Sequence, residues 1–349
     1  MIKDYKKENK ILFKILWEGR TLIALFILVA VFGIKVPNFL TVENMLTVTK
    51  HVAEYALLGI GMTFIILTGG IDLSVGSIVG FAAMIAGGFI YEGIVLQKFG
   101  ITIFLSIPIV IILTLIISAL VGTLNGLIIS YVRIPPFIAT LGTMYVFRGF
   151  ALLRSNGMTF PNLQGKPEYG NTGFEWLGQG FISGIPVAVI IFIIVAIIAA
   201  YILSKTPFGW HVYAVGGNEK AAELSGLKVK KIKILCYTIS GFCAGLVGLI
   251  VASELVASHP AIGEGWEMNA IAAAVLGGAS LSGGIGSIGG TVIGAFIIGV
   301  LNDGMVMMGV SEFWQKVVKG IVIVLAVGLD ILQQEIRKRQ ITKPIPDGK

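Results

Sequence analysis

The sequence is dominated by long apolar runs that are separated by shorter polar stretches. Most of these runs approach the about 20 residues that an α-helix needs to cross a bilayer. No long stretch alternates with a period of two, so the pattern favours helices rather than a membrane β-barrel. The sequence therefore predicts an all-α, polytopic transmembrane helical bundle with about ten membrane segments. The predicted segments are 21–34, 52–67, 75–91, 101–132, 137–153, 185–203, 234–253, 268–281, 285–310 and 313–332.

Four of these segments have unusual lengths. Segment 101–132 is too long for one perpendicular crossing, which predicts a strong tilt or a kink at Pro108. The third, fifth and eighth segments are short for a full crossing. We therefore expect broken or re-entrant helices at these three positions.

Composition and charge agree with a membrane protein. The chain is 56% hydrophobic and 13% charged, whereas a soluble domain carries about 25% charged residues. If the N-terminus lies inside, most of the 26 Lys and Arg residues fall on the cytoplasmic side, as the positive-inside rule requires. The net charge of +7 is spread over these loops and does not indicate a nucleic-acid partner.

This orientation predicts a multi-pass protein of the cytoplasmic (inner) membrane with both termini in the cytoplasm. The predicted parts are a cytoplasmic N-terminal tail at 1–20, a transmembrane domain at 21–334 and a cytoplasmic C-terminal tail at 335–349. Within the transmembrane domain, 154–184 is an outer segment and 204–233 is a cytoplasmic loop.

The loop 204–233 contains a short helix with a signal at each end. Asn218 is a typical N-cap, Glu219 suits the positive end of the helix dipole, and Gly226 can adopt the left-handed conformation beyond the last turn. The small Ala221 and Ala222 would let a partner approach closely, and the charged residues could pair with its rim. The alternative is a solvated connector that contains one turn of helix. The predicted docking residues are Asn218, Glu219, Lys220, Ala221, Ala222, Glu223, Leu224, Ser225 and Gly226.

Two Gly-rich junctions interrupt the apolar pattern, GGIDLSVGS at 69–77 and GGASLSGG at 277–284. They share Gly-Gly, Leu-Ser and a later Gly, which is compatible with internal duplication or with convergence on a helix break. Pairs of glycines four residues apart, such as Gly122 with Gly126 and Gly241 with Gly245, predict close helix packing.

Polar residues in the apolar segments are the candidates for a transport route. Asp72 either caps the helix that follows it or lines a pathway or gate. The other polar residues could equally hydrogen-bond between helices. The candidate pathway residues are Gly69, Gly70, Asp72, Ser74, Asn125, Asn269, Ser280, Ser282 and Asn302.

The sequence offers no recognisable catalytic or metal centre. It lacks a phosphate-binding G-x-x-x-x-G-K-[ST] loop, an H-E-x-x-H motif and a G-x-S-x-G elbow. We therefore expect neither enzyme activity nor a metal site in this chain.

Several ordered motifs resemble the ribose-type sugar permease family. They are GGIDLSVGS, GTLNGLIISYVRIPPFIATLGTMYVFRG (122–149), FGWHVYAVGGNEKAAELSGLKVKKIK (208–233), ELVASHPAIGEGWEMNAIAAAVLGGASLSGG (254–284) and WQKVVKGIVIVLAVGLD (314–330). The resemblance covers nearly the whole chain from the second segment onward.

The resemblance implies a permease subunit of an ATP-driven monosaccharide importer, with ribose, galactose or xylose as the sugar. It also implies a homodimer, a cytoplasmic ATPase that uses ATP and Mg, and an extracytoplasmic sugar-binding protein. The helix at 218–226 would be the coupling helix, and the chain itself would bind no cofactor. The alternative function is a stand-alone, ion-coupled secondary transporter, which predicts buried carboxylates or histidines paired along a pathway.

Overall fold

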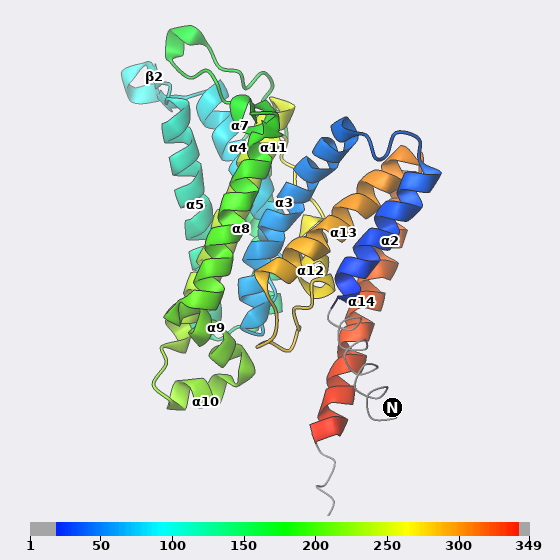
Figure 1. The fold of residues 1–349 in the computed structure, drawn as a ribbon. Coiled ribbons are helices and arrows are strands. Elements are labelled where there is room, and N and C mark those ends of the chain that lie inside the picture. Colours follow the sequence, from blue (N-terminus) through cyan, green and yellow to red (C-terminus); the bar gives the residue numbers. More distant parts are fainter. Residues whose placement is uncertain (1–18, 342–349) are drawn as a thin grey trace, which may run out of the picture.

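A computed structural model describes residues 19–341 of the chain. These residues form a helical bundle with two small β-hairpins, β1–β2 and β3–β4. Elements are labelled as in Figure 1. They are α2 (Arg20–Lys35), α3 (Val42–Leu67), α4 (Val75–Tyr91), β1 (Ile94–Leu96), η1 (Gln97–Phe99), β2 (Ile101–Ile103), α5 (Ile107–Leu127), η2 (Ile128–Val132), α6 (Pro136–Leu153), η3 (Pro167–Tyr169), α7 (Trp176–Gln179), β3 (Phe181–Ile182), β4 (Ile185–Pro186), α8 (Val187–Lys205), α9 (Pro207–Gly217), α10 (Glu219–Leu224), α11 (Val229–Leu255), α12 (Trp266–Leu276), α13 (Ile288–Met307) and α14 (Glu312–Ile341).

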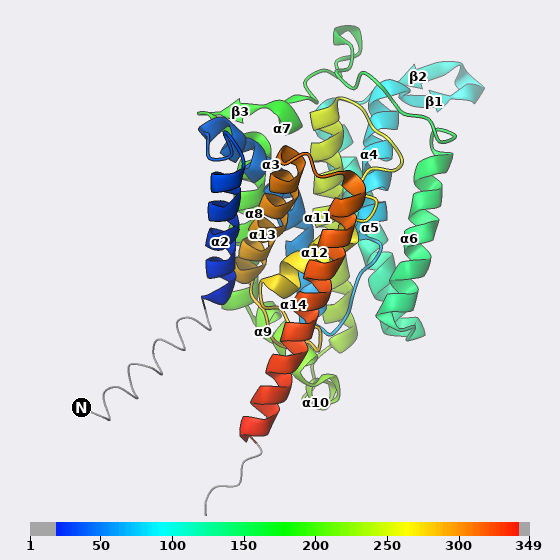
Figure 2. The same cartoon turned by 90° about the vertical axis from the view of Figure 1, so that its right-hand side faces the viewer.

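The helices run between two clearly different ends of the bundle. Figure 1 shows α7 and the β1–β2 hairpin at the upper end, and α9 and α10 at the lower end. The predicted outer segment 154–184 and the predicted cytoplasmic loop 204–233 therefore lie at opposite ends. Figure 2 shows α12 at mid-height behind α14, and α6 at the right-hand edge of the bundle.

Two passes of the chain are only partly helical. α12 has 11 residues, so it is about 16 Å long, against a hydrocarbon core of about 30 Å. A non-helical stretch, 256–265, precedes it, and the non-helical stretch 68–74 likewise separates α3 from α4. The break expected in the eighth segment is thus present, whereas the third segment is a continuous helix, α4, with a break directly before it. The fifth is also unbroken, because α6 is continuous over 18 residues and is apolar enough to cross a membrane.

The long fourth segment also differs from the prediction. Ile101–Ile103 pairs with Ile94–Leu96 as a hairpin, and the helix starts only at Ile107. Pro108 lies in the first turn of α5, where its missing N–H is tolerated, so it starts the helix and does not kink it.

The membrane-spanning character of the bundle follows from helix length and composition. Six described helices are long and apolar enough to cross a membrane, and three shorter apolar helices accompany them. The all-α polytopic fold is therefore confirmed, whereas the number of ten crossings stays a prediction. Residues 1–18 and 342–349, which include most of the predicted tails, lie outside the described residues.

Close helix contacts occur where the sequence places its glycines. A Cβ atom at Gly122 would collide with the carbonyl of Tyr237, and one at Gly241 would collide with the carbonyl of Ser118. The paired glycines thus bring the backbones of α5 and α11 into contact, as predicted for small residues in lipid. α12 and α13 approach in the same way at Gly277 and Gly290.

Candidate translocation and coupling site

The first Gly-rich junction forms a buried polar network around Asp72. Asp72 is fully buried, and its Oδ1 accepts hydrogen bonds from the Ser74 amide (2.9 Å) and the Ser74 hydroxyl (2.6 Å). Its Oδ2 accepts from the Ser240 hydroxyl of α11 at 3.3 Å. The Asn125 amide of α5 donates to Ser74 Oγ at 2.8 Å. One carboxylate therefore joins the break to α5 and α11.

This network changes the capping interpretation. Ser74 occupies the N-cap position of α4, but its side chain makes no capping hydrogen bond and donates to Asp72 instead. Asp72 accepts the Ser74 amide within the turn and so stabilises the entry to α4 without being its N-cap. Asn125 Oδ1 and the Tyr237 hydroxyl are buried nearby and have no hydrogen-bond partner in the described part of the chain.

The two glycines of the junction have different roles. Gly69 adopts the left-handed conformation (φ +76°), which ends α3, whereas Gly70 does not. Space limits that residue instead, because a Cβ atom there would lie 2.7 Å from the Tyr237 hydroxyl oxygen and 3.1 Å from Ile65 Cγ2.

Three diglycine pairs meet at the lower end of the bundle. Gly216-Gly217 at the end of α9 packs against Gly283-Gly284, and a Cβ atom at Gly283 would lie 3.1 Å from the Gly69 amide nitrogen. The Gly284 amide donates to the Leu67 carbonyl at 2.9 Å. We call this contact the diglycine junction. It places both Gly-rich breaks against the segment that carries α10.

The loop of the second break is closed by its own backbone. The Ser280 amide donates to the Ile285 carbonyl at 2.8 Å, and the Ser282 amide donates to Ser280 Oγ at 3.3 Å. Tyr213 of α9 donates to the Gly286 carbonyl at 2.7 Å. Ser280 and Ser282 thus lie beside the diglycine junction and hold its loop in shape.

The short helix predicted in the cytoplasmic loop is α10, and its ends are as expected. Asn218 Oδ1 accepts from the Ala221 amide at 3.0 Å, and Gly226 adopts φ +86°. Glu219 forms an ion pair with Lys233 of α11, with Lys233 Nζ at 2.7 Å from Oε1. Because Glu219 is paired within the chain, it braces α10 against α11.

The exposed face of α10 does not include Ala222, which we expected to face a partner. Ala222 is buried within the chain, with 5% of its surface exposed, so it faces the bundle rather than a partner. Leu224 is 90% exposed and is the main apolar side chain on the open face. The exposed residues of the predicted docking set are Asn218, Glu219, Lys220, Ala221, Glu223, Leu224, Ser225 and Gly226.

Polar residues also gather around the non-helical stretch 256–265 that precedes α12, at mid-height of the bundle. Arg148 of α6 donates to the carbonyls of Pro260, Ile262 (2.9 Å) and Gly76 (3.1 Å). One guanidinium therefore fastens the stretch before α12 to the start of α4. A pocket of about 500 Å³ lies beside it, lined by Arg148, Glu264 and Glu267 among others.

A second pocket beside this stretch has a volume of about 530 Å³ and includes Asn269 in its lining. Asn269 is thus the predicted pathway residue that faces an open space. Asn302 lies on α13, and no hydrogen bond among residues 19–341 joins it to the other predicted pathway residues.

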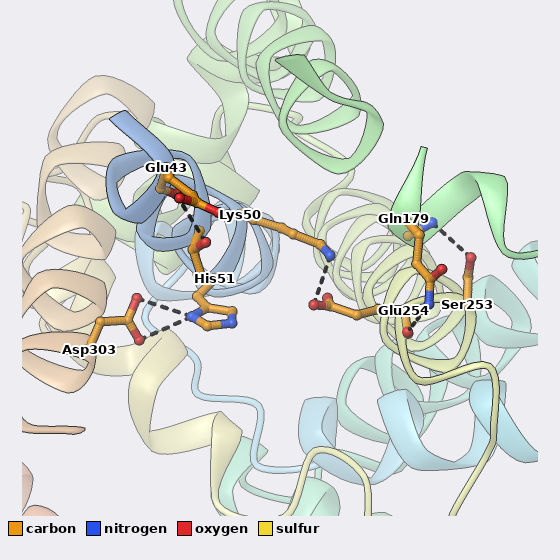
Figure 3. Close-up of polar contacts among 9 residues, drawn as sticks. Glu43, Lys50, His51, Gln179, Ser253, Glu254 and Asp303 are labelled. Carbon is orange, nitrogen blue, oxygen red and sulfur yellow. Dashed lines mark hydrogen bonds and ion pairs between the residues drawn. The ribbon is translucent and has the colours of Figure 1, made fainter. Parts of the chain in front are cut away.

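Two ion pairs connect the upper half of α3 to its neighbours (Figure 3). Lys50 Nζ lies 2.7 Å from Glu254 Oε1 at the end of α11, and His51 Nδ1 lies 3.0 Å from both carboxylate oxygens of Asp303 on α13. Glu54, one turn further along α3, is only 6% exposed. Gln179 of α7 donates to the Glu254 carbonyl at 2.8 Å, which extends the connection to the outer segment.

Comparison with known proteins assigns the family. A family described as "Branched-chain amino acid transport system / permease component" matches residues 44–327. The chain belongs to this family. The permease is therefore a transport subunit of a larger system and not an enzyme. No solved structure matches it.

Curated relatives of the permease are named as sugar permeases. The Ribose import permease protein RbsC of Bacillus subtilis (strain 168) is 46% identical over 308 residues, which cover 88% of this chain and 91% of the relative. The Xylose transport system permease protein XylH of Haemophilus influenzae is 32% identical and covers 88% and 94%. The Galactose/methyl galactoside import permease protein MglC of Escherichia coli (strain K12) is 33% identical and covers 92% and 96%.

The sequence analysis missed three functional features of the permease. Lys50 and His51 were placed outside the second segment, which was expected to begin at residue 52, although α3 begins at Val42. Arg148 was counted only as one of the Lys and Arg residues that indicate orientation. A lone arginine inside an apolar run also indicates that its side chain binds polar groups within the bundle. The contact of Gly216 with Leu67 depends on tertiary structure and has no local sequence signal.

Proposed function

We propose that the permease is the membrane subunit of an ATP-driven importer of a monosaccharide, with ribose as the first candidate. The observation that carries this proposal is the agreement among relatives named for ribose, xylose and galactose import, each matched over most of both chains. The ribose permeases have the highest identities among these, from 40% to 46%.

α10 is proposed as the coupling helix that docks on a cytoplasmic ATPase. Its support is geometric: the helix lies at one end of the bundle, Asn218 and the Glu219–Lys233 pair hold it, and Leu224 stands open to a partner. The partner would bind and hydrolyse ATP with Mg, and this chain would bind no cofactor. We likewise propose that α10 and both termini lie in the cytoplasm, as the distribution of Lys and Arg predicts.

The polar residues at mid-height support a homodimer. Charged and amide side chains are expensive in contact with lipid hydrocarbon. Glu264 is exposed, and Arg148 and Glu267 are half-buried beside the same pocket, so these side chains require water or protein opposite them. A second copy of the permease facing this surface would enclose a polar route between the two chains. The outer segment 154–184, at the opposite end from α10, would receive the sugar-binding protein.

An ion-coupled transporter is a second candidate function, because it requires paired ionisable groups within the bundle, and the His51–Asp303 and Lys50–Glu254 pairs are partly buried examples. The two functions differ in their energy source. Vesicles that contain the permease, its ATPase and its binding protein should import D-ribose with ATP and without an ion gradient. Import driven by a gradient alone would favour the second candidate.

The docking role of α10 is tested by Leu224→Asp. We expect the variant to fold but to lose co-purification of the ATPase and sugar-stimulated ATP hydrolysis by at least tenfold, because burying a Leu side chain contributes about 1.5–3 kcal/mol. Val95→Asp is the matched control, since Val95 is also exposed but lies on β1 at the other end of the bundle. Ala222→Asp is a poor test, because Ala222 is buried inside the permease.

Equal ATPase retention by Leu224→Asp and Val95→Asp would exclude α10 as the docking element. If wild-type complexes imported none of D-ribose, D-xylose and D-galactose, the proposal of a monosaccharide importer would be wrong.

A further inference from the structure

The pocket beside α12 has the shape and position of a binding site for a small solute. It lies between α3, α12 and α14 and has a volume of about 530 Å³. Its lining includes Trp266, the first residue of α12. Ligand pockets in proteins have volumes of about 300–1,000 Å³, so a monosaccharide fits with room for water. Figure 2 places α12 at mid-height of the bundle, where solute sites of transporters with broken helices occur.

One side of the pocket is aromatic. Trp266 and Tyr55 meet edge to face, with ring centroids 5.7 Å apart and an interplanar angle of 70°. Tyr55 lies one turn below His51 on α3, so the pocket opens beneath the ion pairs of Figure 3. An indole face is a platform for the C–H face of a sugar ring, and the polar tips of Trp and Tyr remain free for hydrogen bonds.

Several polar groups in the pocket are unused. Within residues 19–341, no hydrogen bond is made by the Tyr55 hydroxyl, the Trp266 indole N–H or the Asn269 side-chain amide. Tyr55 and Asn269 are each only 6% exposed. The protein does not fully enclose these polar atoms, so they reach the pocket and can bond to water or to an occupant.

The lining combines neutral and charged side chains: Asn269 and Gln315 are buried, Lys319 is half-buried, and Glu264, Glu312 and Lys316 are exposed. Gln315 is 8% exposed and uses its Nε2 to donate to the Val310 carbonyl at 2.8 Å, which leaves its Oε1 as an acceptor. Glu312 and Lys316 are exposed and neutralise each other at 3.2 Å. The amides of Asn269 and Gln315 beside the aromatic pair suit a polyhydroxylated ring, whose hydroxyl groups can also bond to the charged side chains of the lining.

We propose that this pocket is a transit site for a monosaccharide, in which Trp266 stacks on the sugar ring and Asn269, Tyr55 and Gln315 bind its hydroxyl groups. The site rests on the proposed function, because it assumes that a sugar passes through the permease. It adds the residues that would hold the sugar within the bundle.

Substitutions test the site in vesicles that contain the permease, its ATPase and its binding protein. We expect Trp266→Ala and Asn269→Ala to reduce D-ribose uptake at least tenfold, and Trp266→Phe to reduce it only two- to threefold, since Phe keeps an aromatic face. Trp314→Ala is the matched control, because Trp314 is 64% exposed on α14 and does not line the pocket. Wild-type uptake by both alanine variants would overturn the proposal.

A labelling experiment separates binding from a loss of folding. Met268 lines the pocket and is 44% exposed, whereas Met308 is 52% exposed and lies elsewhere, and both native cysteines are buried. We expect D-ribose, but not L-leucine, to slow the reaction of Met268→Cys with a small thiol reagent at least threefold, with no effect on Met308→Cys.

The outcomes distinguish the site from the function. No protection of Met268→Cys, in a complex whose wild type imports D-ribose, would overturn the transit site and leave the proposed function intact. Protection by L-leucine rather than by D-ribose would overturn both, as would a wild-type complex that imports no monosaccharide.

Discussion

The Lys50–Glu254 ion pair allows a quantitative prediction. The two side chains are 16% and 25% exposed, and Glu54, which interacts electrostatically with both, is almost fully buried. Lys50→Met leaves Glu254 without its cation, beside the buried carboxyl group of Glu54. Removing one partner of a buried pair costs about 3–5 kcal/mol.

The partial exposure of the pair lowers these figures, so we expect Lys50→Met to destabilise the permease by about 2–3 kcal/mol. Glu254→Gln should cost less than about 1 kcal/mol, because the flexible Lys50 side chain is partly exposed and its ammonium can turn to water. The double variant Lys50→Met/Glu254→Gln should be more stable than Lys50→Met alone, since it contains one unpaired carboxylate fewer.

The assay is the apparent melting temperature of the purified permease in detergent. A loss of 1 kcal/mol lowers the melting temperature by about 2–4 °C in domains of 150–250 residues, so we expect a decrease of roughly 5–10 °C for Lys50→Met. Lys98→Met is the control, because Lys98 is exposed on η1 and has no ion pair within the described residues. The reasoning would be refuted if Lys50→Met matched this control, or if Glu254→Gln were the more damaging change.

Three further changes test the remaining contacts. Gly216→Ala should abolish uptake or prevent assembly, because its Cβ would collide with the Leu67 carbonyl, whereas Gly217→Ala has open space and should keep at least half of wild-type uptake. Asp72→Asn should keep uptake within about twofold, since the amide oxygen can still accept from Ser74; normal expression without uptake would instead show a charge-dependent role. Arg148→Lys should reduce uptake at least fivefold, because one ammonium cannot reproduce a planar fork that binds three carbonyls; unchanged uptake would show that this clamp is dispensable.

Local signals predicted local structure well. Asn218 and Gly226 marked the ends of α10, because caps depend on a few neighbouring residues. The glycines of α5 and α11 predicted a close helix contact, because only small residues allow backbones to touch. The short eighth segment predicted the break at α12, because helix length is compared directly with bilayer thickness.

The errors arose where neighbours distant in sequence decide the outcome. The inward direction of Ala222 depends on how α10 lies against the rest of the bundle, which a six-residue helix does not specify alone. The upper half of α3 was excluded because hydropathy counts Lys50 and His51 as polar, although Glu254 and Asp303 neutralise them in the fold. The pocket at Trp266 combines three helices, and no stretch of sequence contains it.

The diglycine junction has a mechanical consequence. Where Gly216, Leu67 and Gly284 meet, main-chain atoms touch one another, and no side chain lies between them that could change its rotamer. Side-chain rearrangement therefore cannot absorb a displacement of α9. We expect the end of α3 and the loop before α13 to move with it. The contact therefore couples a small shift at the lower end directly to both broken passes of the permease.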